Sequence, residues 1–180
     1  IGSKIVFGGQ VLAQAVNAAY RTINEDRFLH SLHSYFLEAG DLKVPISYDV
    51  AEMRNGGSFS TRRVTASQNG KTIFILAASF HKKEESFEHQ TKLETTIKPP
   101  EELMSWTDMV EKFGPFLPKR IKSFLSIERP IDFKPVYVPN PAKPENRAAE
   151  EKIWFKLKGD IPKMDLSLKH QILTYISDYN

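Results

Sequence analysis

A pair of glycines at the start of an alanine-rich apolar helix is the feature that most constrains how this chain can fold. The segment reads Phe7-Gly8-Gly9-Gln10-Val11-Leu12-Ala13-Gln14-Ala15, and its apolar residues keep helical spacing from Phe7 to about Arg21. Because glycine lacks a Cβ atom, other backbone can come very close to the beginning of this helix. The small residues of the apolar stripe favour close packing beneath a sheet.

Four strand candidates follow this helix, at residues 28–37, 44–53, 58–68 and 71–81. The last two are joined by Asn69-Gly70, the strongest short hairpin signal, because both residue types tolerate positive φ. Residues 73–78 form a continuous apolar run, which predicts a central strand covered on both faces. A long helix followed by an antiparallel meander predicts an α+β fold with the sheet wrapped around the helix.

The rest of the chain ends in a second helix that resembles the first. Residues 82–100 are charged, residues 101–113 have helical character, and six prolines between positions 118 and 144 indicate an extended connector. A new strand is predicted within residues 148–158 and a helix at 166–178. Residues 10–17 align without gaps with residues 171–178, which indicates an internal repeat.

Several segments together carry a resemblance to a known family. They are the glycine-led helix, His33-Ser34-Tyr35-Phe36-Leu37-Glu38-Ala39-Gly40-Asp41, Gly57-Ser58-Phe59-Ser60-Thr61-Arg62-Arg63-Val64 and Ala77-Ala78-Ser79-Phe80-His81. The chain closely resembles the acyl-CoA thioesterase II family, which includes the peroxisomal acyl-CoA thioesterases. The resemblance implies two tandem hot-dog domains, each an antiparallel sheet wrapped around a long helix.

On this basis we expect three parts. Residues 1–82 form the first hot-dog domain without its N-terminal strand, residues 83–147 form a connector with a helical segment, and residues 148–180 form the truncated start of the second hot-dog domain.

Asp178 is the one catalytic residue that we carry over from the resemblance. On a helical wheel Gln171, Thr174 and Asp178 share a polar stripe, and the pattern alone favours a solvated aspartate. The resemblance implies that the aspartate in Tyr175-Ile176-Ser177-Asp178-Tyr179-Asn180 works with a Ser or Thr and a Gln to orient a water that attacks a thioester carbonyl. We expect those partners beyond Asn180, and therefore negligible acyl-CoA hydrolysis by residues 1–180 alone.

The repeat places Asn17 at the position that corresponds to Asp178. An amide has no useful basicity, so the first repeat is predicted to hold a degenerate site that contributes scaffold and ligand surface.

The expected function is hydrolysis of fatty acyl-CoA to free fatty acid and CoA, without a cofactor apart from the CoA of the substrate. We expect a homo-oligomer formed by hot-dog pairing, in the peroxisome or, for a bacterial protein, in the cytoplasm. Two alternatives stay open. One is a non-catalytic acyl-CoA-binding or assembly module, and the other is a hot-dog enoyl-CoA hydratase or dehydratase, whose chemistry commonly uses an Asp/His pair near the helix start.

Composition and the remaining motifs exclude several other classes. The chain has no cysteine, so disulfides and thiolate metal sites are absent, and its net charge of +3 is spread without a nucleic-acid footprint. No segment is apolar for long enough to span a bilayer. His30 and His33 point to opposite faces of a strand and cannot share a metal ion, and we expect Arg62 and Arg63 to be solvated. Gly8 and Gly9 either offer N–H groups to an anion or permit tight packing.

Overall fold

The computed structural model describes residues 5–92, 97–138, 146 and 148–179. They form two compact units, the first from residues 1–87 and 163–180 and the second from residues 88–162. Pro139, Pro141, Pro144 and Asn180, which entered the sequence predictions, lie outside the described residues. No helix in the described part of the chain is both long and apolar enough to cross a membrane.

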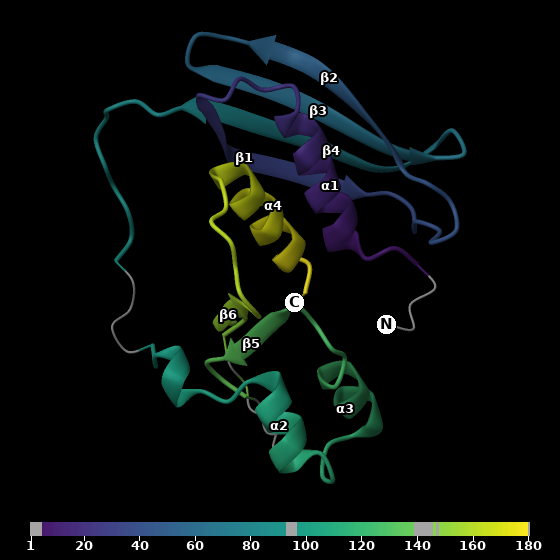
Figure 1. The fold of residues 1–180 in the computed structure, drawn as a ribbon, viewed down its shortest axis with the longest axis vertical. Helices are drawn as coiled ribbons and strands as arrows, with labels where there is room; N and C mark the ends of the chain where they lie inside the picture. The colour runs from purple at the N-terminus through teal and green to yellow at the C-terminus, as the bar shows by residue number, and fades with distance from the viewer. Residues whose placement is uncertain (1–4, 93–96, 139–145, 147, 180) are drawn as a thin grey trace. The chain divides into compact units, whose positions relative to one another are not determined.

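The first unit is an antiparallel sheet wrapped around helix α1 (Gly8–Tyr20), as Figure 1 shows. Its strands are β1 (Arg27–Phe36), β2 (Ser47–Asn55), β3 (Phe59–Gln68) and β4 (Lys71–Lys82), in the spatial order β1-β4-β3-β2. The predicted helix and all four predicted strands are confirmed within a few residues. The α+β prediction is therefore correct for this part of the chain.

The turn between β3 and β4 has the predicted hairpin conformation. Asn69 has φ 49° and Gly70 has φ 77°, so both turn residues lie in the left-handed region. Next to this turn Gln68 pairs with Lys71, and beyond an irregularity between Ala66 and Ser67 the strands continue with Val64 opposite Leu76.

The core of the first unit lies between α1 and the concave face of the sheet. Val16, Ala15 and Ala19 of α1 are fully buried, and the two alanines allow the helix axis to approach the strands closely. The sheet contributes a matching set of buried side chains, namely Val64, Ala66, Phe74, Leu76, Ala78 and Phe80.

Strand β4 is central, but the prediction that both its faces are covered is wrong. Phe74 and Leu76 are buried against α1, whereas Ala77 is exposed and Ile75 is only partly buried. The apolar run therefore reflects the small or β-branched residues that suit a central strand rather than a second buried face.

Helix α4 (Leu166–Ile176) lies beside α1 in the first unit (Figure 1). The Asp165 side chain caps it by accepting a hydrogen bond from the Leu168 N–H. The two helices are antiparallel, because the start of α1 contacts Asp178 while Tyr20 at its end contacts His170. The helix was predicted to reach residue 178 but ends at Ile176, so Asp178 lies in the turn that follows.

The second unit is more structured than the predicted connector. It contains the 3₁₀ helix η1 (Pro100–Glu102), α2 (Trp106–Phe113), α3 (Lys119–Leu125), β5 (Ile131–Pro135) and β6 (Ile153–Leu157). Trp106 stacks on buried Phe133 with ring centroids 4.4 Å apart, and the Arg129 guanidinium lies 5.0 Å from the Trp106 ring. The prolines had indicated an extended connector without a helix after residue 118. Pro118 is instead the N-cap residue of α3, a position at which a helix needs no N–H donor.

The predicted strand within residues 148–158 is present as β6, but its partner is β5 of the second unit. Strand β6 and helix α4 therefore belong to different compact units. The assignment of residues 148–180 to the start of a second hot-dog domain, like the boundaries at 82 and 147, stays a prediction.

Candidate active site

The candidate site forms where α1 begins. Helix α1 follows Phe7, an extended residue whose side chain cannot cap the first N–H groups. The Asp178 carboxylate supplies the missing acceptor, because the Gly9 N–H donates to its Oδ2 over 2.8 Å. A negative group at a helix N-terminus is also favoured by the helix dipole. Residues 169 positions apart in the sequence thus meet at one partly buried point.

Both glycines are required by close contacts at this point. A Cβ atom at Gly9 would lie 2.3 Å from the Tyr175 carbonyl oxygen, and one at Gly8 would lie 2.7 Å from Asp178 Oδ2. The contacts differ from both explanations considered for the glycine pair, which were binding of an oxyanion or phosphate and tight packing against the sheet. The glycines permit tight packing against α4, and one of their N–H groups binds an anion, which is a carboxylate of the chain itself.

Aromatic side chains join the end of α4 to the start of α1. The Phe7 ring lies 5.2 Å from the Tyr175 ring and 4.8 Å from the Tyr179 ring, and the two tyrosine hydroxyls are 3.2 Å apart. Because Tyr175 and Tyr179 lie on either side of Asp178 in the sequence, their contacts with Phe7 join this segment to the start of α1.

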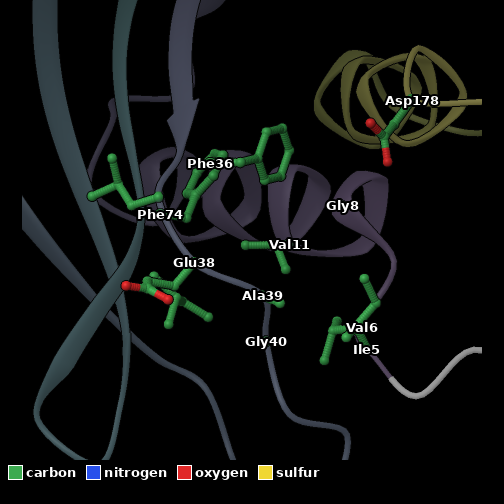
Figure 2. Close-up of a pocket in the computed structure, with 12 residues that line it drawn as sticks. Ile5, Val6, Gly8, Val11, Phe36, Glu38, Ala39, Gly40, Phe74 and Asp178 are labelled. Carbon is green, nitrogen blue, oxygen red and sulfur yellow. The ribbon is translucent and has the colours of Figure 1, made fainter.

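An apolar pocket of about 390 Å³ opens directly beside Asp178 (Figure 2). Asp178 and Glu38 are its charged residues, and Glu38 is paired with Lys71 at 2.7 Å. The rest of the lining comes from the start of α1, the end of β1 with the loop that follows, and the start of β4: Ile5, Val6, Gly8, Val11, Phe36, Leu37, Ala39, Gly40, Ile73 and Phe74.

Asn17 also lies in the contact between α1 and α4. Its side-chain amide donates to Gln171 Oε1 over 3.0 Å, and Gln171 in turn donates to Ser167. In the repeat alignment Asn17 corresponds to Asp178 and Gln171 to Gln10, the neighbour of Gly9. The Asp178–Gly9 contact and the Asn17–Gln171 contact therefore lie at roughly equivalent places in the two repeats. The first contains a carboxylate, and the second contains only neutral amides.

The arrangement at Asp178 suits proton transfer from water. Oδ2 is held by a main-chain donor, while Oδ1 receives no hydrogen bond from the described residues. A carboxylate held in this way can accept a proton from a water placed at its open oxygen. The apolar pocket beside it can take an aliphatic chain.

Two other predictions about functional residues can be compared with the structure. Within the described residues no group of His, Cys, Asp and Glu could hold a metal ion. Arg62 is not solvated as predicted: it is 2% exposed and donates to Thr22, Arg54, Thr61 and Asn55. Alternation along β3 buries Arg62 and leaves its neighbour Arg63 exposed.

The sequence did not reveal the contact between Asp178 and Gly9. The one available signal was that α1 starts after Phe7 without a capping side chain, which left its first N–H groups in need of an acceptor. The role of Phe36, which lines the pocket, was also not predicted.

Comparison with known proteins agrees with this architecture. Residues 1–81 match the family profile described as "Acyl-CoA thioesterase N-terminal domain". The chain is 39% identical to acyl-CoA thioesterase 2 of Haemophilus influenzae, over 100% of this chain and 62% of that protein. It is 37% identical to human acyl-coenzyme A thioesterase 8, over 99% of this chain and 58% of that protein. The peroxisomal acyl-coenzyme A thioester hydrolase 1 of Saccharomyces cerevisiae is 38% identical over 49% of this chain and 27% of that protein.

Solved structures show the same fold. The acyl-CoA thioesterase II TesB2 from Mycobacterium marinum superposes with a TM-score of 0.72 and 32% identity, over 96% of this chain and 59% of that chain. A protein with a hot-dog fold from Alicyclobacillus acidocaldarius, 18% identical, gives a TM-score of 0.66 over 97% of this chain and 58% of that chain. The fold class is therefore the hot-dog fold.

Within that class, these similarities support the acyl-CoA thioesterase II family. The chain spans about three fifths of the length of the Haemophilus influenzae and human relatives.

Proposed function

We propose that the protein containing this chain hydrolyses fatty acyl-CoA to free fatty acid and CoA, with Asp178 as the group that activates water. The observation that supports this most strongly is the position of Asp178, held by the Gly9 N–H at the rim of an apolar pocket. The names of the relatives, which are acyl-CoA thioesterases, support the same substrate class.

In the proposed reaction the acyl tail occupies the apolar pocket and the thioester carbonyl lies beside Asp178. A water bound at Oδ1 gives its proton to the carboxylate while its oxygen forms a bond to the carbonyl carbon. The C–S bond then breaks, and the proton passes from Asp178 to the departing CoA sulfur. A thioester is an activated acyl group, so no covalent nucleophile is needed. A Ser or Thr and a Gln that help to orient the water are expected, from the family resemblance, beyond Asn180.

Asn17 is proposed to mark a site without catalytic function. Its amide donates to Gln171 and cannot accept a proton from water as a carboxylate can. The first repeat would then contribute the pocket and the Gly9 donor, and the second repeat would contribute the base.

The proposal extends to partners, cofactors and location. Within the described residues, strands β1 and β2 are edge strands of the sheet, which suits further hot-dog pairing within or between chains and a homo-oligomer. The proposed hydrolysis requires no cofactor beyond the CoA of the substrate. We place the protein in the peroxisome, or in the cytoplasm for a bacterial source, and a fluorescent fusion tests the location directly.

An assay of the complete natural protein tests the proposed function. Wild type should release free CoA from acyl-CoA, and Asp178→Asn should lower kcat by about 10²- to 10⁴-fold while acyl-CoA still binds. Full activity of Asp178→Asn would contradict the assignment of the base.

The same wild-type and variant proteins distinguish hydrolysis from the two alternative functions, enoyl-CoA hydration and acyl-CoA binding without turnover. Hydration of enoyl-CoA without hydrolysis would favour the hydratase, although His170 contacts the end of α1 and Asp178 contacts its start. Tight acyl-CoA binding without turnover would favour the binding module.

A further inference from the structure

We propose that Phe7 is a positioning residue for the proposed base, because its ring holds the segment that carries Asp178 against the start of α1. Phe7 would act through Asp178 and would touch neither the substrate nor the attacking water. This inference rests on the proposed function, since it takes Asp178 as the group that activates water.

The backbone of Phe7 is fixed as the N-cap of α1. Its carbonyl oxygen accepts hydrogen bonds from the N–H groups of Gln10 and Val11, over 3.1 Å and 3.3 Å. Its side chain makes no capping hydrogen bond, so the Gly9 N–H takes its acceptor from elsewhere, namely Asp178 Oδ2 at 2.8 Å. Figure 2 shows the Asp178 carboxylate facing the start of this helix.

The ring of Phe7 contacts both aromatic neighbours of Asp178. Its centroid lies 5.2 Å from that of the Tyr175 ring and 4.8 Å from that of the Tyr179 ring. The two tyrosine ring centroids are 5.6 Å apart, so the three rings form one cluster. Because one tyrosine precedes the aspartate and the other follows it, Phe7 joins the chain to α1 both before and after Asp178.

The same ring contacts Gly9, the residue that donates to the carboxylate. A Cβ atom at Gly9 would lie 2.6 Å from Phe7 Cε1 and 2.3 Å from the Tyr175 carbonyl oxygen. Gly9 is buried and Phe7 is partly buried, so the ring has neighbours on its glycine side and on its tyrosine side. Phe7 therefore contacts both the donor residue and the segment that supplies the acceptor.

Removing the ring would loosen the carboxylate without changing the lining of the acyl pocket, because Phe7 is not one of the lining residues. A shift of the segment by about 1 Å would lengthen the contact between Gly9 and Asp178 beyond a hydrogen bond. Misplacement by about 1 Å can cost about 10²-fold in rate. We therefore expect a loss in kcat with KM nearly unchanged.

Kinetics of the complete natural protein test this separation of kcat from KM. Phe7→Leu, which keeps an apolar side chain but no ring, should lower kcat for acyl-CoA hydrolysis by about tenfold or more. Tyr179→Leu should also lower kcat, and the loss in the double variant should fall short of the product of the two single losses by about twofold or more. Wild-type kcat in Phe7→Leu, or losses that simply multiply, would overturn the inference and leave the proposed function standing.

Phe59→Leu is the matched control. The Phe59 ring also packs on two other rings, 4.5 Å from that of His81 and 5.7 Å from that of His30, and it does not line the pocket beside Asp178. This variant removes the same kind of ring from the same compact unit, so its kcat should stay at the wild-type value. A loss in Phe59→Leu equal to that in Phe7→Leu would overturn the inference.

Hydrogen exchange of the Gly9 N–H measures the positioning without any hydrolysis. This N–H has no acceptor within α1, so its bond to Asp178 protects it from exchange. In the complete protein it should exchange slowly in wild type, and in Phe7→Leu at nearly the faster rate of Asp178→Ala. The N–H of Val16, a fully buried residue of α1, should exchange as in wild type if the fold is intact.

The exchange rates keep the two proposals distinguishable. Faster exchange at Gly9 alone in Phe7→Leu would uphold the role of Phe7 in holding the Asp178 carboxylate, even if the complete protein hydrolysed no acyl-CoA. Unchanged exchange at Gly9, or an equal acceleration at Gly9 and Val16, would overturn the inference, even if the complete protein hydrolysed acyl-CoA readily.

Discussion

At the scale of single residues, Asp178 is positioned by a main-chain donor at the start of another helix. The Gly9 N–H is fixed by the backbone of α1 and needs no side-chain ordering to point at the carboxylate. Such a preorganised donor costs little reorganisation during a reaction. A carboxylate held by one oxygen keeps the other oxygen available for water.

A second polar contact at this scale predicts a pH dependence of stability. The Leu29 N–H donates to the Tyr20 hydroxyl, which lies 2.6 Å from His170 Nδ1, so we assign the hydroxyl proton to the bond with His170. Burial raises the pKa of Tyr20, which keeps this proton in place, and desolvation lowers the pKa of His170 from its usual 6.5. The folded state therefore binds a proton at His170 less readily than the unfolded state.

The stabilisation that neutral His170 provides is complete above its pKa in the unfolded state. It is lost as the pH falls through its lower pKa in the folded state. Urea unfolding of the chain, followed by circular dichroism, should show a free energy of unfolding that falls below about pH 6.5. The fall should be shallower in His170→Phe and unchanged in His33→Phe, whose ring is exposed. Parallel pH profiles for wild type and His170→Phe would contradict the assignment.

Arg62 and Arg63 offer an adjacent pair for a second prediction. Arg62 is buried, donates to the Thr22 carbonyl and hydroxyl, and lies 3.2 Å from Glu52. Arg62→Met should lower the free energy of unfolding by roughly 3 kcal/mol, because several acceptors lose their donor. Arg63→Met, on the exposed face of the same strand, should change it by less than about 0.5 kcal/mol. Equal losses in urea unfolding would show that Arg62 has no special structural role.

These residues show which features of the site and core could be predicted from the sequence and which could not. The family resemblance suggested Asp178 as a candidate base, but its hydrogen bond with Gly9 depends on tertiary packing between segments far apart in the chain. Alternation along a strand predicts that Arg62 and Arg63 face opposite ways, yet it cannot say which face is buried. The acceptors of Arg62 decide that: Thr22 comes from the turn after α1, and Arg54 and Asn55 come from the end of β2.

At the scale of elements, α1 and α4 form an antiparallel pair joined by polar contacts. The stripe with Gln171 and Asp178 faces α1, whereas Leu168 and Leu173 of α4 are 41% and 52% exposed. The contact between the two segments therefore combines these polar side chains with the glycines of α1 and with aromatic packing of Phe7 on Tyr175. This arrangement agrees with the proposed repeat, in which each helix reserves its apolar side for a sheet.

Gly9 should be essential to this helix pair. A Cβ atom there would lie 2.3 Å from the Tyr175 carbonyl oxygen, a backbone atom that cannot turn aside as a side chain can. Gly9→Ala should lower the free energy of unfolding by about 1–3 kcal/mol through overpacking. Gly57→Ala is the control, because a Cβ atom at Gly57 meets no atom within 4 Å. Wild-type stability of Gly9→Ala in urea unfolding would contradict the packing described here.

Elements with strong local signals were predicted well, and those that depend on partners were not. Asn69 and Gly70 specify the hairpin between β3 and β4 by their own conformational preferences. Strand β5 and helix α3 were missed, because their short segments lie among prolines and gain stability from packing around Trp106 and Phe133.

At the scale of the whole molecule, the chain covers about three fifths of the length of its Haemophilus influenzae and human relatives. The exposed leucines of α4 and the edge strands β1 and β2 are surfaces that a second hot-dog domain would cover. We therefore expect residues 1–180 alone to hydrolyse acyl-CoA negligibly, and the complete protein to hydrolyse it readily. Release of CoA, followed with a thiol reagent, checks both samples. Robust turnover by residues 1–180 alone would contradict this dependence on a second domain.

The central claim is that only the later of the two repeats carries the base. The most direct test is to compare kcat for acyl-CoA hydrolysis by Asp178→Asn and Asn17→Ala in the complete protein. We predict that Asp178→Asn lowers kcat by about 10²-fold or more, whereas Asn17→Ala keeps most of the activity. A loss of kcat in Asn17→Ala as large as that in Asp178→Asn would contradict the account.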